Sequence, residues 1–144
     1  MTITNDYGDK ALGLLRIVAA LLFILHGTSK LFNFPPFPMA IPAMGTLLWI
    51  AAVLEVVGGL MLLVGFLSRP AAFLLSGEMA VAYWMFHAPK STFPAVNGGE
   101  PAILFCFIFL LIAAAGPGAW ALDTARSRKT VVRHDGHHEP TVEG

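Results

Sequence analysis

Six ionisable side chains interrupt the long apolar stretches of this 144-residue sequence, namely Arg16, His26, Lys30, Glu55, Glu78 and His87. A charged side chain near the centre of a membrane helix costs about 2.5 to 3.5 kcal/mol on insertion scales. Such residues are therefore expected to face one another or a polar cavity rather than lipid. Carboxyl, ammonium and imidazole groups held in this way can polarise a bound carbonyl or relay a proton.

The first group of charged residues lies near the middle of the membrane. At about 1.5 Å per residue, Glu55 and Glu78 are about 15 Å and 13 Å from the nearest ends of their segments. Arg16 starts closer to one face, but its long side chain is expected to reach one of the two carboxylates. The pattern predicts an intramembrane charge cluster of Arg16, Glu55 and Glu78. The cluster has two interpretations: a structural ion pair that fixes helix register, or a functional site.

The second group lies near the opposite face. His26 and Lys30 are one helical turn apart and can reach a single oxygen atom, and His87 and Glu100 occupy similar depths. These four residues predict a binding pocket for a quinone or another lipophile under a proline-rich loop, with His26 or Lys30 donating to a quinone carbonyl. The alternatives are a packing role for His26, an interfacial aromatic belt for His87 and, as a weaker interpretation, a bis-histidine haem.

The elements that must hold these residues are four apolar segments: Ala11 to Phe32, Gly45 to Leu67, Arg69 to Ala88, and Pro101 to Ala115. The chain has 56% hydrophobic residues, 12% charged residues and a mean hydropathy of +0.71, which is too apolar for a soluble domain of this size. The sequence therefore predicts an all-α membrane protein, a bundle of four transmembrane helices with close packing between small residues. Ser68 is expected to cap the third helix.

The orientation of this bundle follows from its lysine and arginine residues. One face carries Lys10, Arg69, Arg126, Arg128, Lys129 and Arg133, whereas the loops of the other face carry Lys90. Both termini are therefore predicted to be cytoplasmic. The expected organisation is a cytoplasmic leader at residues 1–10, a transmembrane domain at residues 11–123 and a polar, disordered cytoplasmic tail at residues 124–144. The acidic leader and Arg16 argue against a cleaved signal peptide.

Charge and cysteine content exclude several classes of function. Nine basic residues balance nine acidic ones, so nucleic-acid binding is not expected. Cys106 is the only cysteine, which rules out an internal disulfide, a CxxC redox pair and a thiolate metal cluster. His134, His137 and His138 in the tail lack a folded scaffold, so no metal site is predicted.

Several blocks in the right order give this chain a resemblance to a known family. The blocks are Arg16, then His26-Gly27-x-x-Lys30-Leu31, Glu55 with Gly58-Gly59, Asn97-Gly98-Gly99-Glu100, and Gly116-Pro117-Gly118 with Asp123. This pattern resembles the DoxX family over about Ala11 to Asp123. The resemblance implies a multi-pass protein of the bacterial inner membrane, related to small subunits of thiosulfate:quinone oxidoreductase and terminal quinol oxidase systems. It carries no catalytic mechanism with it.

The leading hypothesis is a membrane subunit or partner in quinone-linked redox metabolism that binds a quinone head group near His26, Lys30 and Glu100. The rival hypothesis is a scaffold, or a protein that binds a lipophile or a partner, without catalysis of its own. A third hypothesis is a solute or proton pathway, for which four short helices leave little room. The expected partners are membrane lipids, other redox subunits and further copies of the same chain.

Overall fold

A computed structural model describes residues 6–36, 38 and 40–127 of the chain. Its elements are α1 (Asp6–Phe32), α2 (Leu47–Val64), α3 (Ser68–Ala82), the π-helix η1 (Tyr83–His87), α4 (Pro94–Asn97) and α5 (Glu100–Ala115). Residues 122–127 form a further short helix. Every regular element in the described part of the chain is helical, so the predicted all-α class is confirmed.

The four apolar segments each contain a helix, with different lengths. α1 and α2 are long and apolar enough to cross a membrane. α3 has 15 residues and reaches 20 only together with the five residues of η1, and α5 has 16. α1 begins at Asp6, inside the expected leader, because Asp6 and Asp9 suit the positive end of a helix dipole.

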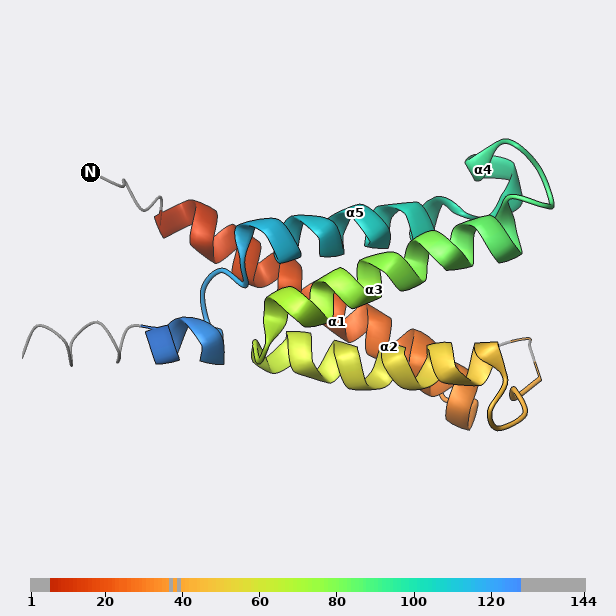
Figure 1. The fold of residues 1–144 in the computed structure, drawn as a ribbon, viewed down its shortest axis with the longest axis horizontal. Helices are drawn as coiled ribbons and strands as arrows, with labels where there is room; N and C mark the ends of the chain where they lie inside the picture. Colours follow the sequence, from red (N-terminus) through yellow and green to blue (C-terminus); the bar gives the residue numbers. More distant parts are fainter. Residues whose placement is uncertain (1–5, 37, 39, 128–144) are drawn as a thin grey trace, which may run out of the picture.

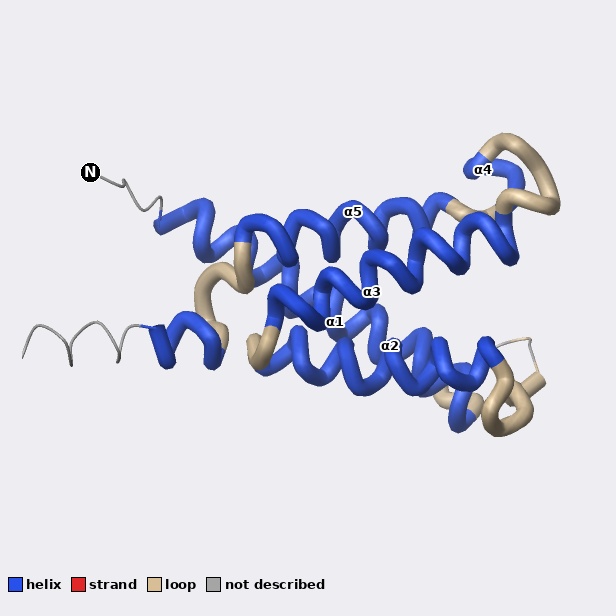
Figure 2. Tube along the Cα trace, in the orientation of Figure 1, coloured by secondary structure: helices blue, strands red, loops and turns tan. Residues whose placement is uncertain are grey.

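The helices pack as two pairs, α1 against α2 and α3 against α5. α2 and α3 are joined by a tight turn and diverge from it along their length (Figure 1). α1 begins and α5 ends at the end of the bundle that contains this turn, which we call the closed end (Figure 1). The opposite end, which we call the open end, carries the 33–46 loop and α4, and the loops are confined to the two ends (Figure 2).

Glycines set the close contact between α1 and α2. A Cβ added to Gly27 would lie 2.6 Å from Val56 Cγ2, and one added to Gly59 would lie 2.7 Å from Ile24 Cγ1. Both distances are too short for any larger residue, so these helices approach each other as the small-residue pattern predicts.

The exterior of the bundle is apolar. The buried core consists of alanine, phenylalanine and larger aliphatic residues such as Ala20, Phe23, Leu75 and Phe109. Large hydrophobic side chains on all four long helices point outward, including Leu21, Leu25, Val57, Leu60, Phe73, Val81, Leu104, Phe107 and Leu111. A soluble protein rarely exposes so continuous an apolar surface, whereas lipid accommodates it.

Arg16 holds the closed end together, and its contacts differ from those predicted. Its guanidinium is fully buried and donates five hydrogen bonds to backbone carbonyls of Leu62, Leu63, Pro117, Ala119 and Trp120. The expected pairing of Arg16 with Glu55 or Glu78 is therefore wrong. The guanidinium instead neutralises the carbonyl end of α2 and ties it to the segment after α5.

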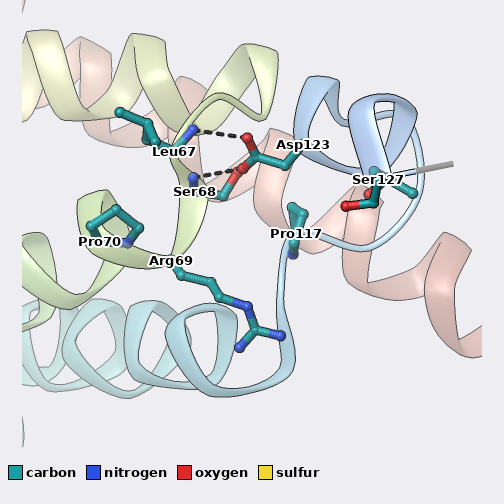
Figure 3. A pocket seen from close by; sticks show the side chains of 8 residues that line it. Leu67, Ser68, Arg69, Pro70, Pro117, Asp123 and Ser127 are labelled. Carbon is teal, nitrogen blue, oxygen red and sulfur yellow. Dashed lines mark hydrogen bonds between the residues drawn. The ribbon is translucent and has the colours of Figure 1, made fainter. Parts of the chain in front are cut away.

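Asp123 also holds the closed end together, and its contacts contradict the predicted cap of the third helix. Its carboxylate accepts hydrogen bonds from the backbone N–H groups of Leu67, at 3.0 Å, and Ser68, at 2.8 Å (Figure 3). The first turn of α3 is thus capped by Asp123 from a distant part of the chain, and the expected cap by Ser68 is wrong. Arg69 caps the other helix end nearby by donating to the last carbonyls of α5.

Several predictions fall on parts of the chain outside the described residues. These are the first half of the leader, most of the tail with Arg128, Lys129 and Arg133, and the tail histidines His134, His137 and His138.

Candidate functional site

A cavity of about 490 Å³ lies between the two helix pairs at the open end. All four long helices contribute to its wall, and so do η1 and the residues that follow it. Its polar lining consists of His26, Lys30, Glu55, Glu78, His87 and Lys90. Volumes of about 300 to 1,000 Å³ are usual for small-molecule sites.

An ion pair between α1 and α2 forms one side of the cavity. Lys30 Nζ donates to Glu55 Oε1 at 2.5 Å, and the two side chains are 17% and 2% exposed. Gly27 makes this contact possible, because a Cβ there would lie only 3.0 Å from the Cβ of Glu55. Removing either partner of a pair so sheltered from water would leave an uncompensated buried charge, which is strongly destabilising.

Glu78 lies on the α3 side of the same cavity without a comparable partner. Both of its carboxyl oxygens are buried and have no hydrogen-bond partner among the described residues. The same holds for Oε2 of Glu55. Glu78 interacts electrostatically with Glu55 and Lys30. Buried polar atoms are nearly always hydrogen-bonded, so these three oxygens mark the place where a ligand or water belongs.

The two histidines complete the polar lining. The ring of His26 meets Phe105 edge-on with centroids 6.0 Å apart. His87 Nδ1 lies 3.2 Å from the carbonyl oxygen of Asn97, and its ring stacks on Tyr83. Because a carbonyl only accepts, His87 Nδ1 must carry the proton, which leaves Nε2 as an acceptor in the neutral ring.

His87 belongs to the π-helix η1, which continues α3 at the open end. This turn is closed by the hydrogen bond from Ala88 N–H to the Tyr83 carbonyl at 2.9 Å. Single π-turns inside or beside α-helices often occur at functional sites, since they change the direction of the following side chains. Here both Phe86 and His87 reach the cavity.

The remaining wall is apolar and includes three phenylalanines. Phe23, Met79, Phe86 and Phe105 line it. The rings of Phe23 and Phe105 touch at a centroid distance of 5.4 Å, and Phe109 continues the cluster below. Aromatic walls with a few convergent polar groups suit a flat, ring-shaped molecule.

The structure regroups the residues that the sequence singles out. His26, Lys30 and His87 line the cavity as expected, but Glu100 does not, because it is the exposed first residue of α5. Glu55 and Glu78, which the sequence assigned to a separate inner cluster, join the first three. Arg16 stays apart at the closed end. Sequence reasoning missed Lys90 and Phe105; the spacing of Pro101, Ala102 and Phe105 on one face of α5 was the available signal.

A smaller pocket of about 370 Å³ lies at the closed end, and its polar lining residues are engaged in structural contacts (Figure 3). Asp123 and Arg69 line it and are engaged with helix ends, as described above. Burial works to raise the pKa of Asp123, but hydrogen bonds from Ser68 and Leu67 and the charge of Arg126 outweigh it and hold that pKa below its usual value. Among the described residues, no group of three or more His, Cys, Asp or Glu side chains is placed to bind a metal ion.

A helix bundle with an apolar exterior and charged side chains gathered in an internal cavity is a membrane protein. The comparisons with known proteins agree. The DoxX family model matches residues 11–88. An uncharacterized protein of Haemophilus influenzae is 46% identical over 130 residues, which cover 87% of this chain and 97% of that protein.

The inner membrane protein YqjF of Escherichia coli K12 is 30% identical over 125 residues, which cover 79% of this chain and 90% of that protein. The chain therefore belongs to the DoxX family, and the resemblance drawn from its sequence is confirmed. No solved structure matches it.

Proposed function

We propose that the cavity at the open end binds the ring of a quinone, and that the protein serves as a subunit or partner in quinone-linked redox metabolism. The observation that carries this proposal is the composition of the cavity, in which three phenylalanine rings and other apolar side chains lie beside a group of ionisable side chains. Lys30 keeps N–H donors beyond the one given to Glu55, and His26 lies one turn away, so a ring carbonyl has donors available.

The proposal includes a location in the bacterial inner membrane with four spans, formed by α1, α2, α3 with η1, and α5. The relative from Escherichia coli is named as an inner membrane protein. Lys10, Arg69 and Arg126 belong to the closed end, and by the positive-inside rule this end and both termini face the cytoplasm. The cavity then opens near the periplasmic face.

Cysteine labelling tests this topology. In a Cys106→Ala background, cysteines at Pro38 and Val96 should react with a membrane-impermeant reagent in intact spheroplasts, and one at Thr130 should react only after lysis. Labelling at Thr130 before lysis would overturn the proposed orientation.

A matched pair of substitutions on α3 tests the binding site. Ala82 lines the cavity, whereas Gly77 faces outward with nothing within 4 Å of an added Cβ. Ala82→Phe should therefore abolish labelling by a photoreactive quinone analogue, and Gly77→Phe should leave it unchanged. Labelling that survives Ala82→Phe would remove the cavity from consideration.

The scaffold hypothesis is favoured by a different observation. Arg16 and Asp123 of the family pattern both form hydrogen bonds with backbone groups at the closed end, and so have structural roles. If the purified protein retains no quinone and takes up no quinone analogue, the scaffold hypothesis replaces quinone binding.

A further inference from the structure

The buried side-chain atoms of the cavity that have no hydrogen-bond partner among the described residues are all carboxyl oxygens. Both oxygens of Glu78 and Oε2 of Glu55 are buried without a hydrogen-bond partner among the described residues. Nε2 of His87 is a further acceptor in the neutral ring, because Nδ1 donates to Asn97. The two carbonyl oxygens of a quinone ring can only accept hydrogen bonds, so they cannot satisfy these acceptors.

Neither lysine of the cavity lining, Lys30 or Lys90, donates a hydrogen bond to Glu78. Lys30 is held by Glu55 at 2.5 Å. Glu78 interacts electrostatically with both Lys30 and Glu55 but is hydrogen-bonded to neither. A buried carboxyl group in this position is best satisfied by a ligand that donates.

We propose that Glu78 makes the cavity selective for a ring that carries a hydroxyl group, such as a quinol or another phenol, over the same ring with carbonyls only. This inference rests on the proposed binding of a ring compound in the cavity. A hydroxyl both donates and accepts, so it matches Glu78 whether the carboxyl group is ionised or protonated. A carbonyl only accepts, so it matches only the protonated form of Glu78.

The shape of the site supports this assignment. Met79 follows Glu78 on α3, and Phe105 of α5 and Phe23 of α1 line the same cavity. A ring packed against these apolar side chains has its edge free to meet the carboxyl groups of α2 and α3. Glu78 therefore acts as a specificity-determining residue through direct contact with the ligand.

Three probes that differ only in their ring oxygens test the inference: decylubiquinone, decylubiquinol and the dimethyl ether of decylubiquinol. Binding is measured anaerobically to the full-length protein in lipid nanodiscs, with empty nanodiscs subtracted to remove partition into lipid. Decylubiquinol should bind about tenfold or more tightly than either of the other two, because each of those lacks the O–H donor. This comparison needs no variant and cannot be confounded by misfolding.

Two matched variants then assign the preference to one residue. Glu78→Gln should bring the ratio of quinone to quinol dissociation constants close to one, because an amide can donate to a carbonyl as well as accept. Glu78 has no protein partner to lose, so the variant should fold. Glu100→Gln, on the exposed first residue of α5, should leave the ratio unchanged.

The outcomes separate this inference from the function on which it rests. Equal affinity for quinone, quinol and ether, or a ratio that Glu78→Gln leaves unchanged, would overturn the hydroxyl preference while quinone binding stands. Binding of none of the three probes would overturn both. If decylammonium binds more tightly than decylubiquinol and loses affinity in Glu78→Gln, the site selects a cation, and the hydroxyl assignment is wrong.

Discussion

Replacing Arg16 with lysine gives the sharpest test of how the closed end is held together. Arg16 donates to five carbonyls from two separate parts of the chain, Leu62 and Leu63 at the end of α2 and the 117–120 segment. A lysine ammonium has three N–H donors, so at least two of those carbonyls must lose their partner. The charge is retained, and the substitution therefore isolates the geometry of the guanidinium.

The expected loss follows from counting these bonds. A hydrogen bond to a charged group contributes about 1.5 to 3 kcal/mol, so two lost bonds destabilise the fold by about 3 to 6 kcal/mol. Domains of this size are usually stable by about 5 to 15 kcal/mol. Arg16→Lys should thus remove a large fraction of the stability and lower the melting temperature by about 10 °C or more.

The assay is thermal unfolding in mild detergent, followed by size-exclusion chromatography of the heated samples. Lys10→Ala on the same helix is the control, because its exposed ion pair with Asp6 should contribute no more than about 0.5 kcal/mol. A loss below about 1 kcal/mol for Arg16→Lys would refute the proposed role. Combining Arg16→Lys with Glu55→Gln should give additive losses within about 0.5 kcal/mol, since the two side chains are not paired.

Three further predictions concern the cavity and the closed end. Lys30→Ala and Glu55→Gln should show a coupling energy of about 0.5 to 3 kcal/mol in a double-mutant cycle of unfolding free energies, and a value near zero would mean that the pair is absent. The pKa of Asp123 is held below its ordinary value of about 3.9, so its stabilisation is complete above that value and is lost as the pH falls through the lowered pKa. The difference in melting temperature between wild type and Asp123→Asn should therefore shrink between pH 5 and pH 2, roughly the range over which such groups titrate, and a constant difference would contradict the capping role. Gly27→Leu should separate α1 from α2, because its Cβ would lie 2.6 Å from the nearest atom of α2, and should abolish binding of a quinone analogue, whereas Gly77→Ala should be neutral or stabilising in a melting experiment.

The positions of the helices could be predicted from local punctuation. The first segment ends at Phe32 and the fourth at Ala115, as the sequence indicates, because a proline-rich loop and Gly116-Pro117-Gly118 stop them. The start of α1 was missed. The acidic residues before Ala11 look like a polar leader, but acidic side chains also favour the first turn of a helix.

The burial of the charged residues could be predicted, but not their partners. Helical spacing places Arg16 and Glu55 on inward faces, and both are fully or almost fully buried. Depth alone suggested that Arg16 pairs with a carboxylate. Its actual partners are backbone carbonyls at the end of α2 and in a segment about one hundred positions later in the chain. No side-chain pattern reveals which carbonyls a folded chain leaves unpaired.

The partner of Lys30 could not be predicted from the sequence either. The position of Lys30 near the end of α1 suggested that it shares a binding pocket near the membrane surface with Glu100. Side chains on a helix lean toward its N-terminus, so the ammonium of Lys30 points back into the bundle and meets Glu55 instead.

The two ends of the bundle divide the family pattern into separate roles. The closed end is held together by hydrogen bonds from Arg16 to the Gly116-Pro117-Gly118 turn and from backbone N–H groups to Asp123. These bonds do not involve the side chains of the cavity. Lys30 and Glu55 belong to the open end, where the helix pairs diverge and polar atoms remain without partners. Because the fastening of one end does not depend on the lining of the other, substitutions in the cavity can change its ligand without unfolding the bundle.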